Sequence, residues 1–240
     1  MKKVFVFDVD GTLTPARQRM KDDFVHFFQP FCEENKVYLV TGSDRGKVLE
    51  QVPERILDLV EGVFTCSGNQ YWEGDKIVYS NDFEPSQNLF DFLNRCLLRT
   101  SYKNKTGNHI EVRPGTINFS VIGRNCTDRE RKAYSVWDRM TGERKMIRNE
   151  LVSLFPTIDC VIGGEISVDI YPVGCDKAQS ILFIKDRDPD CTIVFYGDKL
   201  TPGGNDYPVY SVLDENIQDL AVCVEGWEQT RDHLQEHYHG

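Results

Sequence analysis

Residues 4–14 read VFVFDVDGTLT, and this stretch decides the fold. Residues 4–7 are apolar and either β-branched or aromatic, which is typical of a parallel strand buried on both faces. Asp8 and Asp10 follow at the carboxyl end of that strand. Ligands of open α/β sheets bind at this edge, so both carboxylates are placed to bind a divalent cation and a phosphate together.

An Asp-x-Asp-Gly sequence also occurs in calcium-binding loops and in ordinary turns. In an EF-hand loop that began at Asp8, glycine would be the sixth residue and an acid the twelfth. Here Gly11 is the fourth residue and Arg19 the twelfth, which excludes an EF-hand. An ordinary turn stays open on this segment alone.

The composition is that of an ordinary globular protein. With 240 residues, 40% of them hydrophobic and 28% charged, one or two domains with a sizeable core are expected. The formal net charge of −10 argues against nucleic-acid binding, because a surface that binds phosphate backbones must be basic. No apolar stretch approaches the roughly twenty residues that span a bilayer, and the N-terminus reads as a core strand. We therefore expect no membrane partner and a cytoplasmic location.

The cysteines and the C-terminal histidines form no metal or redox motif. The eight cysteines are never closer than fifteen positions, so neither zinc-type pairs nor a redox Cys-x-x-Cys exists, and reduced, mostly buried thiols are expected. His233, His237 and His239 are expected to lie in a frayed polar tail rather than in a metal site.

Strand and helix patterns alternate in the first third of the chain. Helical periodicity over residues 16–34 precedes a strand at 36–40, a helical pattern over 45–60 that Pro53 interrupts, and a short strand at 62–65. This alternation predicts an α/β fold with a doubly wound, Rossmann-like parallel sheet.

From about residue 81 the pattern changes to hairpins and helices. Turns at Pro114-Gly115 and Gly163-Gly164 join pairs of short strands, with helical segments near 84–99 and 127–155. The parallel type of pattern returns near Asp176. We therefore expect a core domain of residues 1–80 plus 176–240, with an inserted α+β cap domain of residues 81–175.

Several polar side chains follow the other expected core strands. Asp198 would approach Asp8 and the backbone of Asp10 if their strands are neighbours, which completes an oxygen cage for Mg²⁺; a surface loop is the alternative. Lys177 could hold the transferring phosphoryl group, or be solvated. Further along, Asp206 could hold water, orient Lys199 or form a turn. Two hydroxyl residues after the second strand offer donors to a phosphate, with helix capping as the alternative: Thr41 and Ser43.

Arginines recur in the inserted segment. Arg113 ends one expected strand, Arg124 follows the next, and Arg131 lies at the start of a helix that Thr127 and Glu130 open as a capping box. A helix N-terminus with nearby guanidinium groups favours anion binding, although acids are nearly as frequent as bases in this stretch.

The order and spacing of these motifs resemble one family. Residues 7–14 resemble the first motif of the haloacid dehalogenase (HAD) superfamily, and nearly the whole chain is similar to the eukaryotic-type phosphomannomutases of that superfamily. The further strings that carry the resemblance are EVR (111–113), IGRNCT (122–127), GGEISVD (163–169), GCDK (174–177), GDK (197–199) and PGGND (202–206), with Arg17 behind the first motif.

The resemblance implies roles for these residues. It implies Asp8 as nucleophile and Asp10 as general acid and base, with Lys177 beside them, and it implies Mg²⁺ bound by Asp8, Asp10 and Asp198. The residues implied to bind the hexose phosphate are Arg17, Arg113, Arg124, Arg131, Ser167 and Asp169. Ser167 and Asp169 lie two apart, hence on one face of an expected strand.

The implied reaction interconverts mannose 6-phosphate and mannose 1-phosphate, and glucose phosphates as further substrates, for GDP-mannose synthesis. An aspartyl-phosphate would form from a hexose 1,6-bisphosphate activator, and the cap would exclude water from it. A homodimer formed through the cap is also implied. Three departures from the family stand out: Thr41 replaces a usual glycine, Cys175 stands where the family often has tryptophan, and residues 207–212 lack an acid used in an accessory cation site.

Two other functions stay open from sequence. A HAD-type sugar-phosphate phosphatase would use the same core, with water attacking the aspartyl-phosphate. A catalytically silent sugar-phosphate binding protein would keep the arginines, although the set of Asp8, Asp10, Lys177 and Asp198 argues against it.

Overall fold

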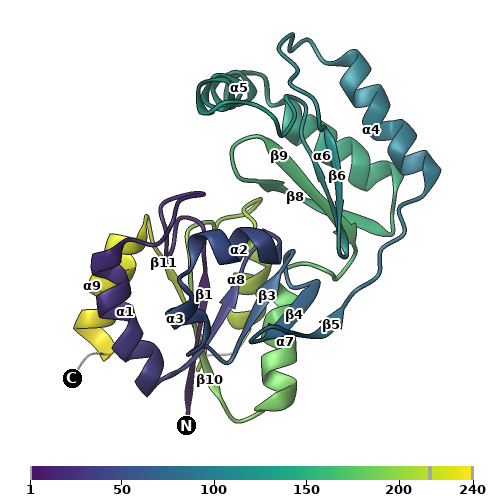
Figure 1. Cartoon of the computed structure of the whole chain (residues 1–240). Helices are drawn as coiled ribbons and strands as arrows, with labels where there is room; N and C mark the ends of the chain where they lie inside the picture. Colours follow the sequence, from purple (N-terminus) through teal and green to yellow (C-terminus); the bar gives the residue numbers. More distant parts are fainter. Residues whose placement is uncertain (1, 216–217, 239–240) are drawn as a thin grey trace. The chain divides into compact units, whose positions relative to one another are not determined.

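The structure is a computed structural model that describes residues 2–215 and 218–238. The chain divides into two compact units (Figure 1). The first unit comprises Met1–Ser80 and Asp176–Gly240, and the second comprises Asn81–Cys175.

A seven-stranded sheet of order β11-β10-β1-β2-β3-β4-β5 forms the centre of the first unit. The strands from β11 to β3 are parallel, whereas β4 and β5 are antiparallel to their neighbours. The bounds of the strands are β1 (Lys3–Asp8), β2 (Lys36–Val40), β3 (Gly62–Thr65), β4 (Gln70–Glu73), β5 (Lys76–Ser80), β10 (Thr192–Gly197) and β11 (Leu220–Cys223).

Helices cover both faces of this sheet (Figure 1). Their bounds are α1 (Asp22–Glu34), α2 (Arg45–Gln51), α3 (Glu54–Leu57), α7 (Ala178–Arg187), α8 (Tyr207–Leu213) and α9 (Trp227–Tyr238). Because side chains alternate along a strand, Phe5 and Phe7 of β1 pack in the core with α1 and α9, whereas Val4 and Val6 pack in a second core with α7 and α8. The strand is therefore buried on both faces, and the predicted doubly wound fold is confirmed.

The second unit packs three helices on one face of an antiparallel sheet of order β6-β7-β9-β8. The strands are β6 (Ile110–Arg113), β7 (Thr116–Phe119), β8 (Ile158–Gly163) and β9 (Ser167–Pro172), and the helices are α4 (Gln87–Arg99), α5 (Asp128–Thr141) and α6 (Glu143–Leu154). Ile117, Phe119 and Ile170 face the helices. The other face carries Asn118 directly opposite Asp169.

Two expectations about the first unit need correction. The sheet is not wholly parallel, because the β4–β5 hairpin adds two antiparallel strands at its edge. The C-terminal segment is not a frayed tail: it forms α9, whose Leu234 is fully buried and whose His233 Nδ1 lies 2.9 Å from the Tyr196 hydroxyl. His239 lies outside the described residues.

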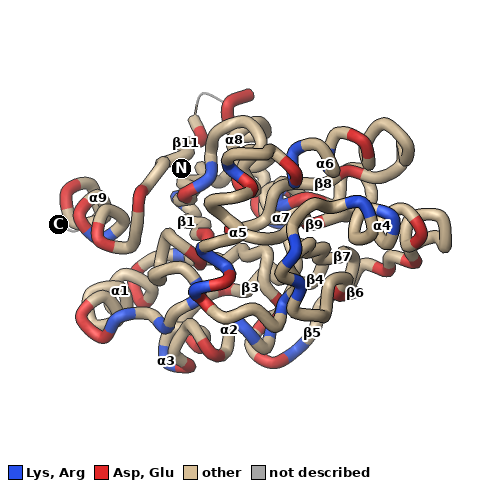
Figure 2. Tube along the Cα trace, turned by 90° about the horizontal axis from the view of Figure 1, so that it is seen from above, with Lys and Arg blue, Asp and Glu red and all other residues tan. Residues whose placement is uncertain are grey.

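The eight cysteines are all free thiols, and five of them are buried. Among the described helices, none combines the length and the apolar character that crossing a membrane requires. Lysine, arginine, aspartate and glutamate residues are interspersed over each unit (Figure 2). A phosphate must therefore be bound by a local arrangement of side chains, because no broad basic field is present among the described residues.

Candidate active site

Three carboxylates meet at the carboxyl edge of the first sheet. Asp8 ends β1, Asp198 follows β10, and Asp206 precedes α8. Because β1 and β10 are neighbouring parallel strands, with Phe7 paired to Tyr196, their ends lie side by side. One oxygen of each carboxylate lies within 4.8 Å of the others. Together with Lys177, we call Asp8, Asp198 and Asp206 the carboxyl-edge cluster.

Lys177 lies in the middle of this cluster, immediately before α7. Its ammonium group is fully buried and donates hydrogen bonds to Asp8 Oδ1 and, at 2.6 Å, to Asp206 Oδ1. Burial alone would lower the pKa of Lys177, but Asp206 and Asp8 raise it above its usual value. The lysine therefore stays charged between two carboxylates.

Burial raises the pKa of Asp8 well above its usual value, and the nearby Asp206 and Asp198 add to this effect against the opposing charge of Lys177. Burial also raises the pKa of Asp198, although Lys199 partly offsets the rise. The buried acids of the cluster thus outnumber its buried cation. Carboxylate oxygens are the ligands that Mg²⁺ prefers, so the cluster fits a divalent cation.

Gly11 allows this close approach. Its φ is +84°, and a Cβ atom there would lie 2.7 Å from Asp198 Oδ2. Only glycine combines this backbone conformation with the absence of a side chain that would displace the Asp198 carboxylate.

The Asp10 carboxylate is turned away from the cluster. Its Oδ1 accepts hydrogen bonds from the Arg17 backbone N–H at 2.6 Å and from Gln51 Nε2 at 2.8 Å, and its Oδ2 accepts one from Ser43 Oγ at 3.4 Å. Its side chain is therefore not part of the acidic group that could hold a metal.

The two hydroxyl residues after β2 have different surroundings. Thr41 is buried, and its Oγ1 accepts a hydrogen bond from the Ser43 backbone N–H at 3.1 Å. Ser43 bonds to Asp10, whereas Asp44 caps α2 by accepting from the Lys47 N–H at 2.8 Å. Capping thus falls to Asp44, and the Ser43 hydroxyl lies beside Asp10 at the carboxyl edge of the sheet.

Arg17 is present at this edge through its backbone. Its φ of 62° is left-handed, and this conformation directs its N–H at Asp10. Its side chain is exposed. The structure therefore associates the main chain of Arg17, rather than its guanidinium group, with Asp10.

The polar face of the second sheet brings most of the predicted substrate residues together. Glu111 pairs with Arg113 at 2.5 Å and with Arg124 at 3.5 Å, and Arg124 Nη1 donates to Ser167 Oγ at 3.3 Å. Asp169 Oδ1 accepts from Asn118 Nδ2 at 2.5 Å.

Arg131 belongs to α5 rather than to the strands. It is 6% exposed and lies near the start of the helix, where the predicted capping box of Thr127 and Glu130 is present. The structure thus gathers Arg113, Arg124 and Ser167 around Glu111 and places Arg131 at a helix N-terminus.

Sequence reasoning missed Gln51 and the contact of Asp206 with Lys177. Asp206 binds the ammonium group of Lys177, and its second oxygen accepts from the backbone N–H of Lys199 at 3.1 Å. Gln51 contacts Asp10, which stands 41 positions earlier in the chain. An isolated glutamine or aspartate carries no local pattern that would have indicated these contacts.

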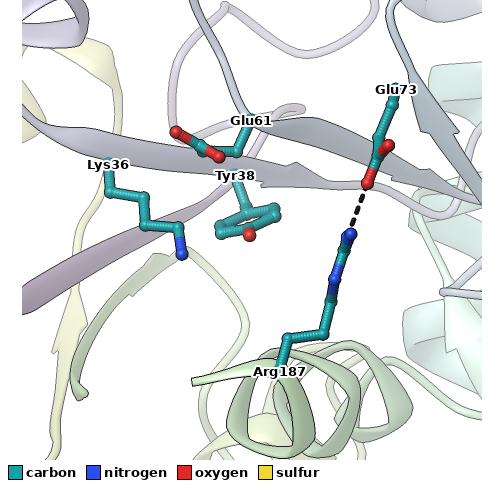
Figure 3. A pocket seen from close by; sticks show the side chains of 5 residues that line it. All are labelled: Lys36, Tyr38, Glu61, Glu73 and Arg187. Carbon is teal, nitrogen blue, oxygen red and sulfur yellow. Dashed lines mark hydrogen bonds and ion pairs between the residues drawn. The ribbon is translucent and has the colours of Figure 1, made fainter. Parts of the chain in front are cut away.

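A pocket of about 370 Å³ lies at the opposite edge of the sheet, where β2 begins and α7 ends (Figure 3). Its lining residues are Lys36, Tyr38, Glu61, Glu73 and Arg187. Glu73 and Arg187 point toward each other and pair at 2.5 Å, and Lys36 pairs with Asp188 at 3.4 Å. These pairs neutralise most of the charge in the pocket, so it has no features of a phosphoryl-transfer site.

Comparison with known proteins agrees with this geometry. The profile of the family described as "Eukaryotic phosphomannomutase" matches residues 24–239. A protein of Caenorhabditis elegans named "Probable phosphomannomutase" is 33% identical over 98% of this chain and 94% of its own length. The chain belongs to the eukaryotic phosphomannomutase family. A "Phosphomannomutase" of Drosophila melanogaster is 34% identical over 87% of the chain and 86% of its own length.

The fold of this phosphomannomutase-family chain also matches solved structures. A haloacid dehalogenase-like hydrolase from Bacteroides thetaiotaomicron superposes with a TM-score of 0.62 at 13% identity, over 98% of this chain and 99% of that one. At this identity the match concerns the fold alone. Membership of the phosphomannomutase family identifies the chain as an enzyme, and its fold is that of the haloacid dehalogenase-like hydrolase.

Proposed function

We propose that this enzyme interconverts mannose 6-phosphate and mannose 1-phosphate through an aspartyl-phosphate at Asp8, and that it accepts glucose phosphates as further substrates. Its product would supply GDP-mannose synthesis. The observation that supports this most is the carboxyl-edge cluster: a buried carboxylate ends the first strand and contacts a buried lysine, in a chain of the phosphomannomutase family.

In the first step an oxygen of Asp8 attacks the phosphorus of a hexose 1,6-bisphosphate, and the bond between phosphorus and the sugar oxygen breaks. Lys177 holds the other Asp8 oxygen and stabilises the negative charge that develops around the phosphorus. In the second step a hydroxyl of the bound hexose monophosphate attacks the same phosphorus, and the Asp8 carboxylate leaves.

Asp10 moves the proton in both steps. Its carboxyl gives a proton to the departing sugar oxygen and takes one from the attacking hydroxyl. Asp10 follows Asp8 by two residues, and its Oδ1 accepts a hydrogen bond from the Arg17 backbone N–H.

Mg²⁺ would be held by the carboxylates of Asp8 and Asp198 and by the backbone carbonyl of Asp10, and the Asp206 carboxylate belongs to the same acidic group as Asp8 and Asp198. The cation supplies neutralisation of the phosphoryl oxygens. Thr41 and Ser43 provide polar groups for the same phosphate.

The second unit serves as the substrate-specificity cap. Arg113, Arg124 and Arg131 bind the phosphate that is not reacting, because guanidinium groups bind phosphate in a bidentate manner in either orientation of the sugar. Ser167 and Asp169 bind sugar hydroxyls. A homodimer formed through this unit and a cytoplasmic location stay predictions, and sedimentation of the purified protein tests the first of them.

A coupled assay tests the proposal. With mannose 1-phosphate, Mg²⁺ and a hexose 1,6-bisphosphate, we expect mannose 6-phosphate to accumulate without steady release of inorganic phosphate. Steady phosphate release without isomerised sugar phosphate would instead establish the phosphatase alternative. Asp8→Asn is the control: it should abolish turnover while sugar-phosphate binding persists, and undiminished turnover would exclude Asp8 as the nucleophile.

A further inference from the structure

Gln51 is a buried polar residue that contacts Asp10. It ends α2, is 1% exposed, and its Nε2 lies 2.8 Å from Asp10 Oδ1. The same nitrogen is 3.3 Å from Thr14 Oγ1 and 3.3 Å from the Gln18 carbonyl. Its Oε1 is buried and has no hydrogen-bond partner among the described residues. The amide therefore directs its donor side at acceptors around Asp10.

Asp10 depends on neutral donors for its orientation. Within residues 2–215 and 218–238 it forms no ion pair, and its contacts are the Arg17 backbone N–H, Gln51 Nε2 and the more distant Ser43 hydroxyl. When only uncharged donors bind a carboxylate, the directions of those hydrogen bonds determine its orientation, because no nearby charge does so.

Gln51 also holds the loop that carries the other close donor. Its backbone carbonyl accepts from the Met20 N–H at 2.8 Å, and its side chain bonds to the Gln18 carbonyl. Both contacts lie within three residues after Arg17, which has a left-handed φ and directs its N–H at Asp10. Gln51 therefore acts on Asp10 twice, directly and through this loop.

The unpartnered Oε1 argues against a purely structural role. A buried acceptor without a donor destabilises a fold, so packing alone would favour an apolar side chain of similar length, such as methionine. We propose that Gln51 is a positioning residue that orients the Asp10 carboxyl for proton transfer at the sugar oxygen. This inference rests on the proposed function of Asp10 as general acid and base.

The experiment compares two phosphoryl donors in Gln51→Met. When a hexose 1,6-bisphosphate phosphorylates Asp8, the sugar oxygen that departs from phosphorus needs a proton, whereas acetyl phosphate releases acetate, which needs none. We expect kcat for mannose 1-phosphate to fall roughly 10- to 100-fold, with KM within about twofold, because general acid catalysis contributes factors of this order. In Gln51→Met, acetyl phosphate should phosphorylate Asp8 at the wild-type rate, as measured by mass spectrometry of the intact protein.

The controls separate the alternatives. Glu50→Gln changes the neighbouring exposed residue of α2, which pairs with Lys47, and should leave both rates unchanged. Gln51→Asn keeps the amide but shortens the side chain by one methylene. If the methionine variant folds poorly, this variant should likewise show slower turnover of mannose 1-phosphate and an unchanged rate of phosphorylation by acetyl phosphate. Equal losses with both donors, no loss with either, or failure of both variants to fold overturns the inference. Absence of phosphorylated Asp8 in the wild type would instead overturn the proposed function.

Discussion

Lys177 holds two carboxylates in a site that solvent does not reach, and its removal tests how far the carboxyl-edge cluster depends on it. In Lys177→Met, the acids at 8 and 206 lose their shared cation, and breaking a buried ion pair in this way costs about 3–5 kcal/mol. We expect urea denaturation at neutral pH to show a loss of this size in the free energy of unfolding.

Lys199→Met is the matched control. Lys199 pairs with Asp198, but 56% of its side chain is exposed, and an exposed ion pair contributes little. We expect the free energy of unfolding of Lys199→Met to differ little from that of the wild type. Equal effects of the two substitutions would show that burial of Lys177 does not matter to the fold.

At the scale of single elements, the sequence correctly predicted features that depend on residues close together in the chain. The apolar run of β1 predicted a strand buried on both faces, and the cores on either side of it confirm this. The capping box of Thr127 and Glu130 opens α5 as expected. Pro53 ends one helical pattern and becomes the N-cap of α3, because proline lacks the N–H that a helix interior needs.

Other elements depend on contacts that no local pattern contains. The β4–β5 hairpin forms because the edge of β3 accepts an antiparallel partner, with Phe64 opposite Tyr71. The mostly polar segment of α9 is ordered because Leu234 is buried, Trp227 packs against the core, and α1 lies beside it. The helix α1 lies far from α9 in the sequence, whereas β3 directly precedes β4.

The helix α9 carries a pH-dependent contact. Burial and the neighbouring His237 lower the pKa of His233, whose Nδ1 faces the Tyr196 hydroxyl. The unfolded chain therefore binds a proton at this residue at higher pH than the folded chain does, so stability falls as pH falls below about 6.5. We expect His233→Asn to reduce the loss of stability between pH 7.5 and 5.5, measured by urea denaturation at each pH.

The exposed His26 of α1 provides the comparison. The matched control substitution is His26→Gln. A His233→Asn curve that runs parallel to the wild-type curve over the same range would contradict the assignment.

At the scale of the whole molecule, the motifs were predictable but their assembly was only partly so. Asp8 and Asp198 follow strands of a recognisable type, so their meeting at one edge follows once β1 and β10 are neighbours. The contact of Lys177 with Asp206 joins the start of α7 to a loop 29 positions later, and Gln51 reaches Asp10 across 41 positions. Such contacts depend on helix placement, which periodicity does not specify.

The overall charge offers a test of the cation site. The chain has a net charge of −10, so any salt could stabilise it by screening, whereas the carboxyl-edge cluster requires a divalent ion. We expect Mg²⁺ at about a hundredfold excess over its Kd to raise the thermal midpoint by roughly 5–10 °C over the chelated protein. Sodium chloride at equal ionic strength should not, and equal shifts would indicate general screening.

The second unit is inserted into the first, so the ribosome synthesises the two segments of the first unit at different times. The ribosome adds Asp8 among the first residues of the chain. Lys177, Asp198 and Asp206, which surround Asp8 in the folded protein, are added only after residue 175. The intervening 81–175 segment emerges complete, with its own sheet and apolar interior, before the central strand β1 meets its neighbour β10. A nascent polypeptide halted anywhere before that junction has Asp8 but lacks Lys177, Asp198 and Asp206, so the carboxyl-edge cluster is completed only in a late stage of translation.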